Sequence, residues 1–291
     1  MNCKVEVESI QAELKEYITK SQLKSLVIGI SGGIDSTVCA ALARPVCIDK
    51  SIPLIGRSLP IETNKDDEKE RALKVGEAFC TDFKEFDLTR AYSAFLMNLR
   101  DEDTVPNFDP MKHKVRLGNI KARVRMIYLY EMAQRHEGLV LSTSNYTELM
   151  LGFWTLHGDV GDFGMIQNYW KTEVYDIAAY IRDCFQGMGL TDKAIAIDEC
   201  IKAVPTDGLG ITSSDLDQLG EDTYEKVDII LKTWLCDDID SFHYDKFLKF
   251  EGRPKEYDEF ELQRKKLESN PVVQRHLRTM FKRENPYNVR R

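Results

Sequence analysis

The fold of this chain is decided by residues 29–37, which read Gly29-Ile30-Ser31-Gly32-Gly33-Ile34-Asp35-Ser36-Thr37. The apolar run Leu26-Val27-Ile28 comes directly before them, and an alanine-rich stretch from Val38 to Ala43 follows. This order predicts a buried strand, a glycine turn and the start of a helix in immediate succession. Backbone N–H groups converge in such a turn, and the helix N-terminus adds about half a positive charge. The segment is therefore predicted to hold a phosphate group.

The side chains of the turn refine this prediction. Gly32 and Gly33 can adopt positive φ and let an anion approach the main chain. Hydroxyl donors are supplied by Ser31, Ser36 and Thr37. No lysine follows the glycines, so the segment is not a Walker A loop. Asp35 would repel a triphosphate unless it holds Mg²⁺, which prefers one or two carboxylates together with phosphate oxygens. The alternative is a plain glycine turn in which Ser36 caps the helix and Asp35 interacts with the helix dipole.

The composition is that of a globular protein with an acidic balance. Of the 291 residues, 43% are hydrophobic and 30% are charged, and 40 basic against 48 acidic side chains give a net charge of −8. This balance argues against nonspecific binding to nucleic acid or to anionic membranes. No apolar run approaches the roughly 18 residues of a membrane span, and the N-terminal residues lack the hydrophobic core of a signal peptide. We therefore expect no membrane and no nucleic-acid partner.

Cysteine and histidine usage indicates a reducing compartment. The seven cysteines are an odd number without a C-x-x-C pair, and most stand beside apolar residues, as buried free thiols do. A cytoplasmic location is the expectation. The five histidines are scattered without an H-x-x-x-H pair, which argues against a zinc site.

Strand and helix patterns alternate along the chain. Strands are predicted at Leu26–Ile30, Pro53–Ser58, Phe83–Asp87 and Gly138–Ser142. Helices are predicted at Val5–Thr19, from Ser36 to an end or bend near Pro45, at Lys65–Phe79, Leu88–Arg100, Arg116–Arg135, from Asn145, at Lys171–Phe185 and at Lys193–Ala203. Loops are predicted at Asp101–Lys114 and His157–Gly164, and the polar helical remainder has breaks at Pro205–Gly210, Lys249–Lys255 and Asn270–Pro271. This alternation predicts an α/β fold: a doubly wound parallel sheet with flanking helices and a helical C-terminal region.

A second group of polar residues follows the fourth predicted strand. Right-handed crossovers place the carboxyl ends of parallel strands along one edge, so the turn after Ser142 is expected beside the glycine turn. There the Thr143 hydroxyl can reach a phosphate, and Glu148 can complete a Mg²⁺ shell with Asp35. Lys171, at the start of a later helix, can reach across to the same phosphate.

Each of these residues also has a simpler interpretation. Thr143 or Asn145 can cap a helix, and Glu148 and Lys171 can lie on solvated faces. Asp159 and Asp162 stand among glycines, where a surface turn is the usual explanation. Their joint occurrence behind S-G-G-x-D-S favours the functional interpretation.

Several strings resemble known enzymes. Ser31-Gly32-Gly33-Ile34-Asp35-Ser36 resembles the signature of the PP-loop ATP pyrophosphatases, which cleave ATP between the α and β phosphates. From about residue 22 to 209 the chain resembles the ammonia-dependent NAD synthetases. The matching strings are Arg57-Ser58-Leu59-Pro60, Gly118-Asn119-Ile120-Lys121-Ala122-Arg123-Val124-Arg125-Met126, Thr143 to Asp162, Lys171-Thr172-Glu173-Val174, Pro205-Thr206-Asp207 and, more weakly, Phe281-Lys282-Arg283. The string from Gly118 to Met126 is the most discriminating, because other PP-loop enzymes lack it.

The resemblance implies an organisation and a set of partners. It implies an adenine nucleotide alpha-hydrolase-like fold in a single domain, residues 1–291, with a nucleotide-binding core at about 22–209 and a helical C-terminal extension at 210–291. It also implies a homodimer with an extended helical interface. The implied substrates are ATP, deamido-NAD and ammonia, with Mg²⁺ as the cofactor.

The resemblance also implies site residues. The ATP-binding residues would be Gly29, Ile30, Ser31, Gly32, Gly33, Ile34, Asp35, Ser36, Arg57, Thr143, Lys171 and Thr206. Asp35 and Glu148 would hold Mg²⁺, and Asp35 and Lys171 would be catalytic. Deamido-NAD would contact Arg123, Asp162 and Lys282, partly from the partner subunit. The chain departs from the family pattern at Leu156 and Val160, where a lysine and a glycine are frequent, and at Phe281, where a histidine is frequent.

The implied reaction has two steps. The nicotinate carboxylate of deamido-NAD attacks the α-phosphorus of ATP and expels pyrophosphate; ammonia then attacks the acyl-adenylate and gives NAD and AMP. A glutamine-dependent enzyme would need an amidase domain, for which 291 residues leave no room, so ammonia itself is expected. Two alternatives stay open. One is another PP-loop ATP pyrophosphatase, either an amide ligase or a tRNA-modifying enzyme, and the other is a nucleotide-binding regulator with weakened catalysis.

Overall fold

Five strands form one parallel sheet in the part of the chain that the computed structural model describes, residues 1–62, 64–99, 109–206, 214–235, 262 and 264–283. The strand order is β3-β2-β1-β4-β5. The bounds are Ser25–Gly29 (β1), Leu54–Ser58 (β2), Asp82–Glu85 (β3), Gly138–Ser142 (β4) and Phe163–Gly164 (β5). At the centre, Val27 of β1 is in register with Ile55 of β2 and Val140 of β4. The predicted doubly wound α/β fold is confirmed.

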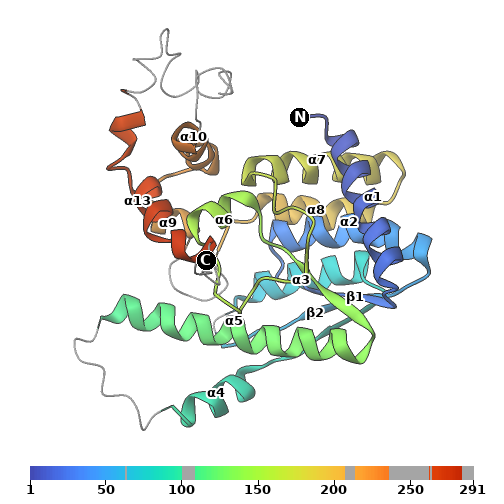
Figure 1. The fold of residues 1–291 in the computed structure, drawn as a ribbon. Helices are drawn as coiled ribbons and strands as arrows, with labels where there is room; N and C mark the ends of the chain where they lie inside the picture. The colour runs from blue at the N-terminus through green and yellow to red at the C-terminus, as the bar shows by residue number, and fades with distance from the viewer. Residues whose placement is uncertain (63, 100–108, 207–213, 236–261, 263, 284–291) are drawn as a thin grey trace, which may run out of the picture.

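Helices cover both faces of the sheet (Figure 1). One face carries α1 (Cys3–Ser21), α2 (Ile34–Lys50), α3 (Asp66–Phe79), α7 (Lys171–Gly187) and α8 (Thr191–Lys202). The other carries α5 (Pro110–Arg135), against which α4 (Thr89–Met97) packs. Leu26 and Ile28 of β1 pack on the first face, whereas Val27 between them packs with Met126 and Leu129 of α5. Successive strand side chains point to opposite faces, so a strand that is apolar throughout needs cover on both sides.

A separate group of helices stands beside one end of the sheet (Figure 1). These helices are α6 (Tyr146–Leu151), α9 (Asp215–Leu219), α10 (Tyr224–Leu235), α13 (Pro271–Arg278) and α14 (Met280–Arg283). The first four share an apolar cluster that includes Leu151, Leu219, Leu231 and Val272. The predicted break at Asn270–Pro271 is confirmed, because the Asn270 side chain caps α13 by accepting a hydrogen bond from the Val272 N–H at 2.8 Å. The predicted break at Lys249–Lys255 lies outside the described residues, as does Asp207–Gly210 of the break at Pro205–Gly210.

Three predictions about local structure are wrong. Of the end or bend predicted near Pro45, the end is wrong: α2 continues to Lys50, because buried side chains on both sides of the proline keep the helix packed against the core. Residues 110–114 are not part of a loop, since Pro110 occupies the first turn of α5 and Asp109 caps it by accepting from the Met111 N–H at 2.9 Å. Residues 101–108 of that predicted loop lie outside the described residues.

The third wrong prediction concerns the segment 157–164, which contains β5 rather than a loop alone. This two-residue strand is too short to carry an alternating pattern. Gly161 allows the close approach, because a Cβ there would lie 2.6 Å from the Ser142 nitrogen of β4. Most other element bounds differ from prediction by one to three residues, as is usual at element ends.

The described cysteines are all free thiols, and Cys39, Cys47 and Cys200 are buried. None of the described helices is long and apolar enough to cross a membrane.

Candidate active site

A cavity of about 390 Å³ opens at the carboxyl ends of β1, β2 and β4, where ligands bind in open parallel sheets. All the residues predicted to bind ATP line it, namely residues 29–36, Arg57, Thr143, Lys171 and Thr206. The C-terminal helices also reach it, through Asp215, Gln218, Arg275 and Lys282. The cavity therefore combines the sheet edge with side chains from the far end of the chain.

Of the two glycines in the turn, Gly32 has the positive φ that the sequence allows, whereas Gly33 has a φ of −91°. Gly32 has a φ of +79°, and a Cβ at this position would lie 2.3 Å from the Glu68 carbonyl oxygen of α3. Only glycine fits, both for its φ and for this close approach. α2 begins at Ile34, two residues after Gly32, so the free N–H groups at its start face the cavity. The hydroxyl of Ser36 accepts from the Ser31 N–H at 3.3 Å and donates to the Gly33 carbonyl at 3.1 Å, which braces the turn.

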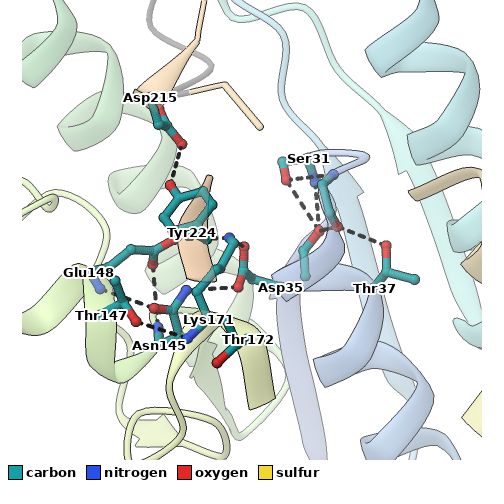
Figure 2. Close-up of polar contacts among 12 residues, drawn as sticks. Ser31, Asp35, Thr37, Asn145, Thr147, Glu148, Lys171, Thr172, Asp215 and Tyr224 are labelled. Atoms are coloured by element: carbon teal, nitrogen blue, oxygen red, sulfur yellow. Dashed lines mark hydrogen bonds and ion pairs between the residues drawn. The ribbon is translucent and has the colours of Figure 1, made fainter. Parts of the chain in front are cut away.

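Two carboxylates meet one ammonium group beside this turn (Figure 2). The Lys171 Nζ lies 2.5 Å from Asp35 Oδ2 and 3.4 Å from Glu148 Oε1. Its side chain is 3% exposed, against 17% for Asp35 and 19% for Glu148. Burial lowers the pKa of Lys171, but the two carboxylates outweigh it and hold that pKa well above its ordinary value. Burial and the charge of Asp35 raise the pKa of Glu148 to about 8, although Lys171 opposes them.

The Asp35–Glu148 pair fits a magnesium ion. Both carboxylates lie within 3.4 Å of the Lys171 ammonium, and the pKa of Glu148 stays raised although Lys171 lowers it, so the pair can accept further positive charge. No group of three or more histidine, cysteine or acidic residues suited to a metal occurs in the described part of the chain. Two carboxylates are nevertheless the usual protein share for Mg²⁺, which takes its other ligands from phosphate and water.

Asn145 orients both carboxylates. Its Nδ2 donates to Asp35 Oδ1 at 2.9 Å, and its Oδ1 accepts from the Glu148 N–H at 3.0 Å. Glu148 Oε2 in turn accepts from the Asn145 N–H at 3.3 Å, which completes a capping box at the start of α6. The simpler interpretation of Asn145 as a cap is thus confirmed. The sequence signal for its link to Glu148 is the N-x-x-E spacing, whereas nothing in the sequence indicates its link to Asp35.

The C-terminal helices supply neighbours of Lys171 that sequence reasoning missed. The ring of Tyr224 lies 5.4 Å from the Lys171 Nζ, a distance at which a cation is attracted to an aromatic face. The Tyr224 hydroxyl donates to Asp215 Oδ2 at 3.2 Å (Figure 2). Tyr224 lies more than 40 positions after Lys171, so no local pattern could reveal their contact.

Arg57 and Thr206 line the cavity, yet their side chains bind protein groups. The Arg57 guanidinium donates to Asp82 Oδ2 at 2.7 Å and to the Asp82 carbonyl at 2.9 Å, which ties β2 to β3. The Arg57 Nε is buried and has no hydrogen-bond partner among the residues that the structure describes. The Thr206 hydroxyl donates to Glu68 Oε1 at 2.8 Å.

The residues predicted to contact deamido-NAD are only partly brought together. The Lys282 ammonium lines the cavity and donates to the Gly152 carbonyl at 2.7 Å and to the Trp154 carbonyl. Arg123 and Asp162 do not line it. The Arg123 Nε donates to the Leu156 carbonyl at 3.1 Å. Asp162 accepts from the Tyr130 hydroxyl at 2.8 Å and from the Val140 N–H at 3.0 Å, so it fastens β5 to β4.

Asp159 is a further carboxylate on the cavity wall. Its two oxygens accept from the Thr155 N–H at 2.8 and 3.0 Å. Burial raises the pKa of Asp159 to about 6, although this hydrogen bonding and the charge of Lys282 lower it. Sequence reasoning placed Asp159 in a surface turn, because the glycines around it hide the packing that encloses it.

A parallel sheet with a glycine turn, a helix start and a carboxylate pair at its edge is the arrangement of the PP-loop class of nucleotide-dependent enzymes. Residues 6–286 match the NAD synthase family. The chain therefore belongs to the NAD synthase family, whose members are ligases, and the predicted resemblance is confirmed.

Individual relatives agree with this assignment. The chain is 32% identical to the NH(3)-dependent NAD(+) synthetase of Finegoldia magna over 76% of its own length and 81% of that protein. Its fold is similar to that of an NMN synthetase from Francisella tularensis, with a TM-score of 0.71, 24% identity and complete coverage of both chains. The NH3-dependent NAD synthetase from Campylobacter jejuni gives a TM-score of 0.66 at 23% identity, again over both complete chains.

Proposed function

We propose that the protein catalyses the ATP-dependent amidation of deamido-NAD by ammonia, giving NAD, AMP and pyrophosphate through an acyl-adenylate. The observation that carries this proposal is the meeting of Asp35, Glu148 and Lys171 at the glycine turn within one cavity. An ATP molecule whose phosphates lie on the turn would place its α-phosphate beside this centre. The relatives' names and the family match support the same reaction.

The protein's own residues supply binding and charge stabilisation. The N–H groups at the start of α2 bind phosphate oxygens, and the Lys171 ammonium stabilises the charge that develops as pyrophosphate leaves. Asp35 and Glu148 would hold Mg²⁺, which when bound supplies further positive charge for the leaving group. No protein nucleophile is needed, because the attacking oxygen belongs to the nicotinate carboxylate and the nitrogen to ammonia.

The deamido-NAD site is proposed beside Lys282, with Arg123 and Asp162 contributing to it. Lys282 on the cavity wall supports this position. Arg123 on α5 binds the Leu156 carbonyl, and Lys282 binds the Gly152 and Trp154 carbonyls, so both side chains contact the segment 152–156. A site completed by the partner subunit accounts for the distribution of these residues over several elements.

A homodimer through α5 is proposed on the basis of its uncovered apolar side chains. Ile127 is 70% exposed and Tyr130 is 40% exposed on this helix, and Val115 lies further along it with 38% exposure. Such a patch is typical of a protein interface. Ile127→Glu should therefore convert the dimer to a monomer in analytical ultracentrifugation; a wild type that sediments as a monomer refutes the dimer. A cytoplasmic location without a nucleic-acid partner is proposed on the cysteine usage and net charge.

The function is tested by following pyrophosphate and NAD together. The purified enzyme receives Mg-ATP, deamido-NAD and ammonium, and each component is omitted in turn. Release of pyrophosphate that requires deamido-NAD, with NAD formed in equal amount, supports the proposal. Ammonia-free glutamine should give no NAD. Because one structural neighbour is an NMN synthetase, nicotinate mononucleotide is tested in parallel. A preference for it would replace deamido-NAD as the substrate, and ATP binding without turnover would favour a regulator.

A further inference from the structure

One face of α10 lies against the start of α7, where Lys171 is located. Tyr224, Asp228 and Lys232 are spaced by four residues and so share this face. The Tyr224 ring lies 5.4 Å from the Lys171 Nζ, and the Lys232 Nζ lies 4.9 Å from the centre of the Trp170 ring. Asp228 stands between them and binds the backbone of the first turn of α7. A helix from the C-terminal region thus contacts Lys171 and the residues on both sides of it.

Asp228 completes a cap on α7 to which α7 itself contributes Glu173, whose carboxylate accepts from the Trp170 N–H at 2.9 Å. The first N–H groups of a helix have no partner within the helix, and Trp170 at the N-cap position supplies no side-chain hydrogen bond. The Lys171 N–H instead donates to the Thr147 hydroxyl at 2.8 Å, and the Thr172 N–H donates to Asp228 Oδ2 at 2.9 Å. The Thr147 hydroxyl then donates to Asp228 Oδ1 at 2.5 Å.

This cap is enclosed and charged. Thr147 is 0% exposed and Asp228 is 2% exposed, so water cannot replace either partner. A carboxylate at a helix N-terminus is favoured by the helix dipole, and its hydrogen bonds from N–H groups are stronger than those of a neutral acceptor. The Lys171 N–H is therefore held by Thr147 of α6, and Asp228 of α10 holds both the next N–H, that of Thr172, and the Thr147 hydroxyl.

We propose that Asp228 is a positioning residue for Lys171, acting through Thr147 and the first turn of α7. The proposal rests on the proposed function, in which the Lys171 ammonium stabilises the leaving pyrophosphate. The lysine stem is flexible, so the place of its ammonium depends on the backbone from which it extends. Misplacement of a catalytic group by about 1 Å can cost about 100-fold in rate.

The test compares three variants of the full chain. Asp228→Ala removes both acceptors, and kcat should fall at least about tenfold while KM for deamido-NAD changes less than about threefold. Asp228→Asn keeps one oxygen for the Thr172 N–H and should recover part of kcat. The matched control is Thr233→Ala, on the same helix and equally buried, whose hydroxyl donates to the Ile229 carbonyl of α10 itself. This variant should have a lower unfolding temperature. At temperatures where it is still folded, its kcat should equal that of the wild type.

A second measurement does not depend on turnover. Labelling with acetic anhydride, read by mass spectrometry, reports the accessibility of Lys171, with exposed Lys4 on α1 as the internal reference. Lys171 should gain reactivity in the Asp228 variants and not in Thr233→Ala. An enzyme without the proposed activity still reports in this assay, so the two proposals fail separately. If Asp228→Ala does not fold, Asp228→Asn carries the test.

Three results would overturn the proposal. In the first, Asp228→Ala, or Asp228→Asn if the alanine variant does not fold, keeps kcat within twofold of the wild type. In the second, kcat falls but the labelling of Lys171 stays unchanged, which would mean that Asp228 acts by another route. In the third, Thr233→Ala lowers kcat as much as Asp228→Ala, which would assign the effect to the general stability of α10.

Discussion

Gly32→Ala should damage both the stability and the nucleotide site, for reasons that can be worked out from its position. A residue with a side chain at a φ of +79° costs about 1–2 kcal/mol. The added Cβ would lie 2.3 Å from the Glu68 carbonyl oxygen and 3.0 Å from the Ala72 nitrogen, both backbone atoms of α3. Relief requires the turn and α3 to move apart, at a cost of about 1–3 kcal/mol. The two terms together predict a loss of about 2–5 kcal/mol in the free energy of unfolding.

Urea denaturation of the wild type, of Gly32→Ala and of two control variants measures this loss. Gly187→Ala has no atom within 4 Å of its new Cβ and should change the free energy of unfolding by less than about 1 kcal/mol. Gly33→Ala, at a φ of −91° with its nearest contact at 3.3 Å, should cost about 1 kcal/mol at most. The rise in unfolding temperature on adding Mg-ATP should disappear in Gly32→Ala and stay unchanged in Gly187→Ala, which lies outside the cavity wall. If Gly32→Ala is as stable as Gly33→Ala, the reasoning about close approach is wrong.

Three further outcomes are expected. Asp35→Ala should keep its fold but lose at least about 100-fold in turnover, and normal turnover at ordinary Mg²⁺ would remove Asp35 from the metal site. Arg123→Lys should weaken the use of deamido-NAD by about 1.5–3 kcal/mol with little effect on ATP, because a lysine cannot reproduce the guanidinium fork; an equal loss for both substrates in steady-state kinetics would contradict this. The pKa of Asp159 is raised to about 6, so its contribution to stability is present below about pH 4 and is lost as the pH rises through 6. Relative to the wild type, Asp159→Asn should therefore gain roughly 1–3 kcal/mol in urea denaturation between pH 4 and pH 7, and a difference independent of pH would disprove the burial of a charge there.

The sheet and the glycine turn could be predicted because their signals are local. An apolar run, two glycines and a helix start occupy consecutive positions, and each restricts the backbone by itself. The strands at residues 54–58 and 138–142 have the same kind of signal. The long α5 could also be predicted, but not its start, since Pro110 is as compatible with a loop as with a first helical turn.

Long-range contacts are what the sequence could not reveal. Asp228 lies 81 positions after Thr147, and no spacing rule joins them. Arg57 is correctly placed at the end of β2, but its guanidinium points to Asp82, which depends on the position of β3. Family resemblance indicated Lys171 and Glu148 together, whereas the residues that hold them in place, Asn145 and Asp228, needed the folded chain.

The cavity wall runs from Gly29 on β1 to Lys282 on α14, so it uses nearly the whole length of the chain. During synthesis at about 5–20 residues per second, the first wall residue leaves the ribosome roughly 13–50 s before the last. The sheet and its covering helices can form in that interval, but a nascent chain cannot close the cavity until its C-terminal helices have emerged. A chain truncated just before α13 would likewise keep every strand of the sheet but lack Arg275 and Lys282 from the cavity wall.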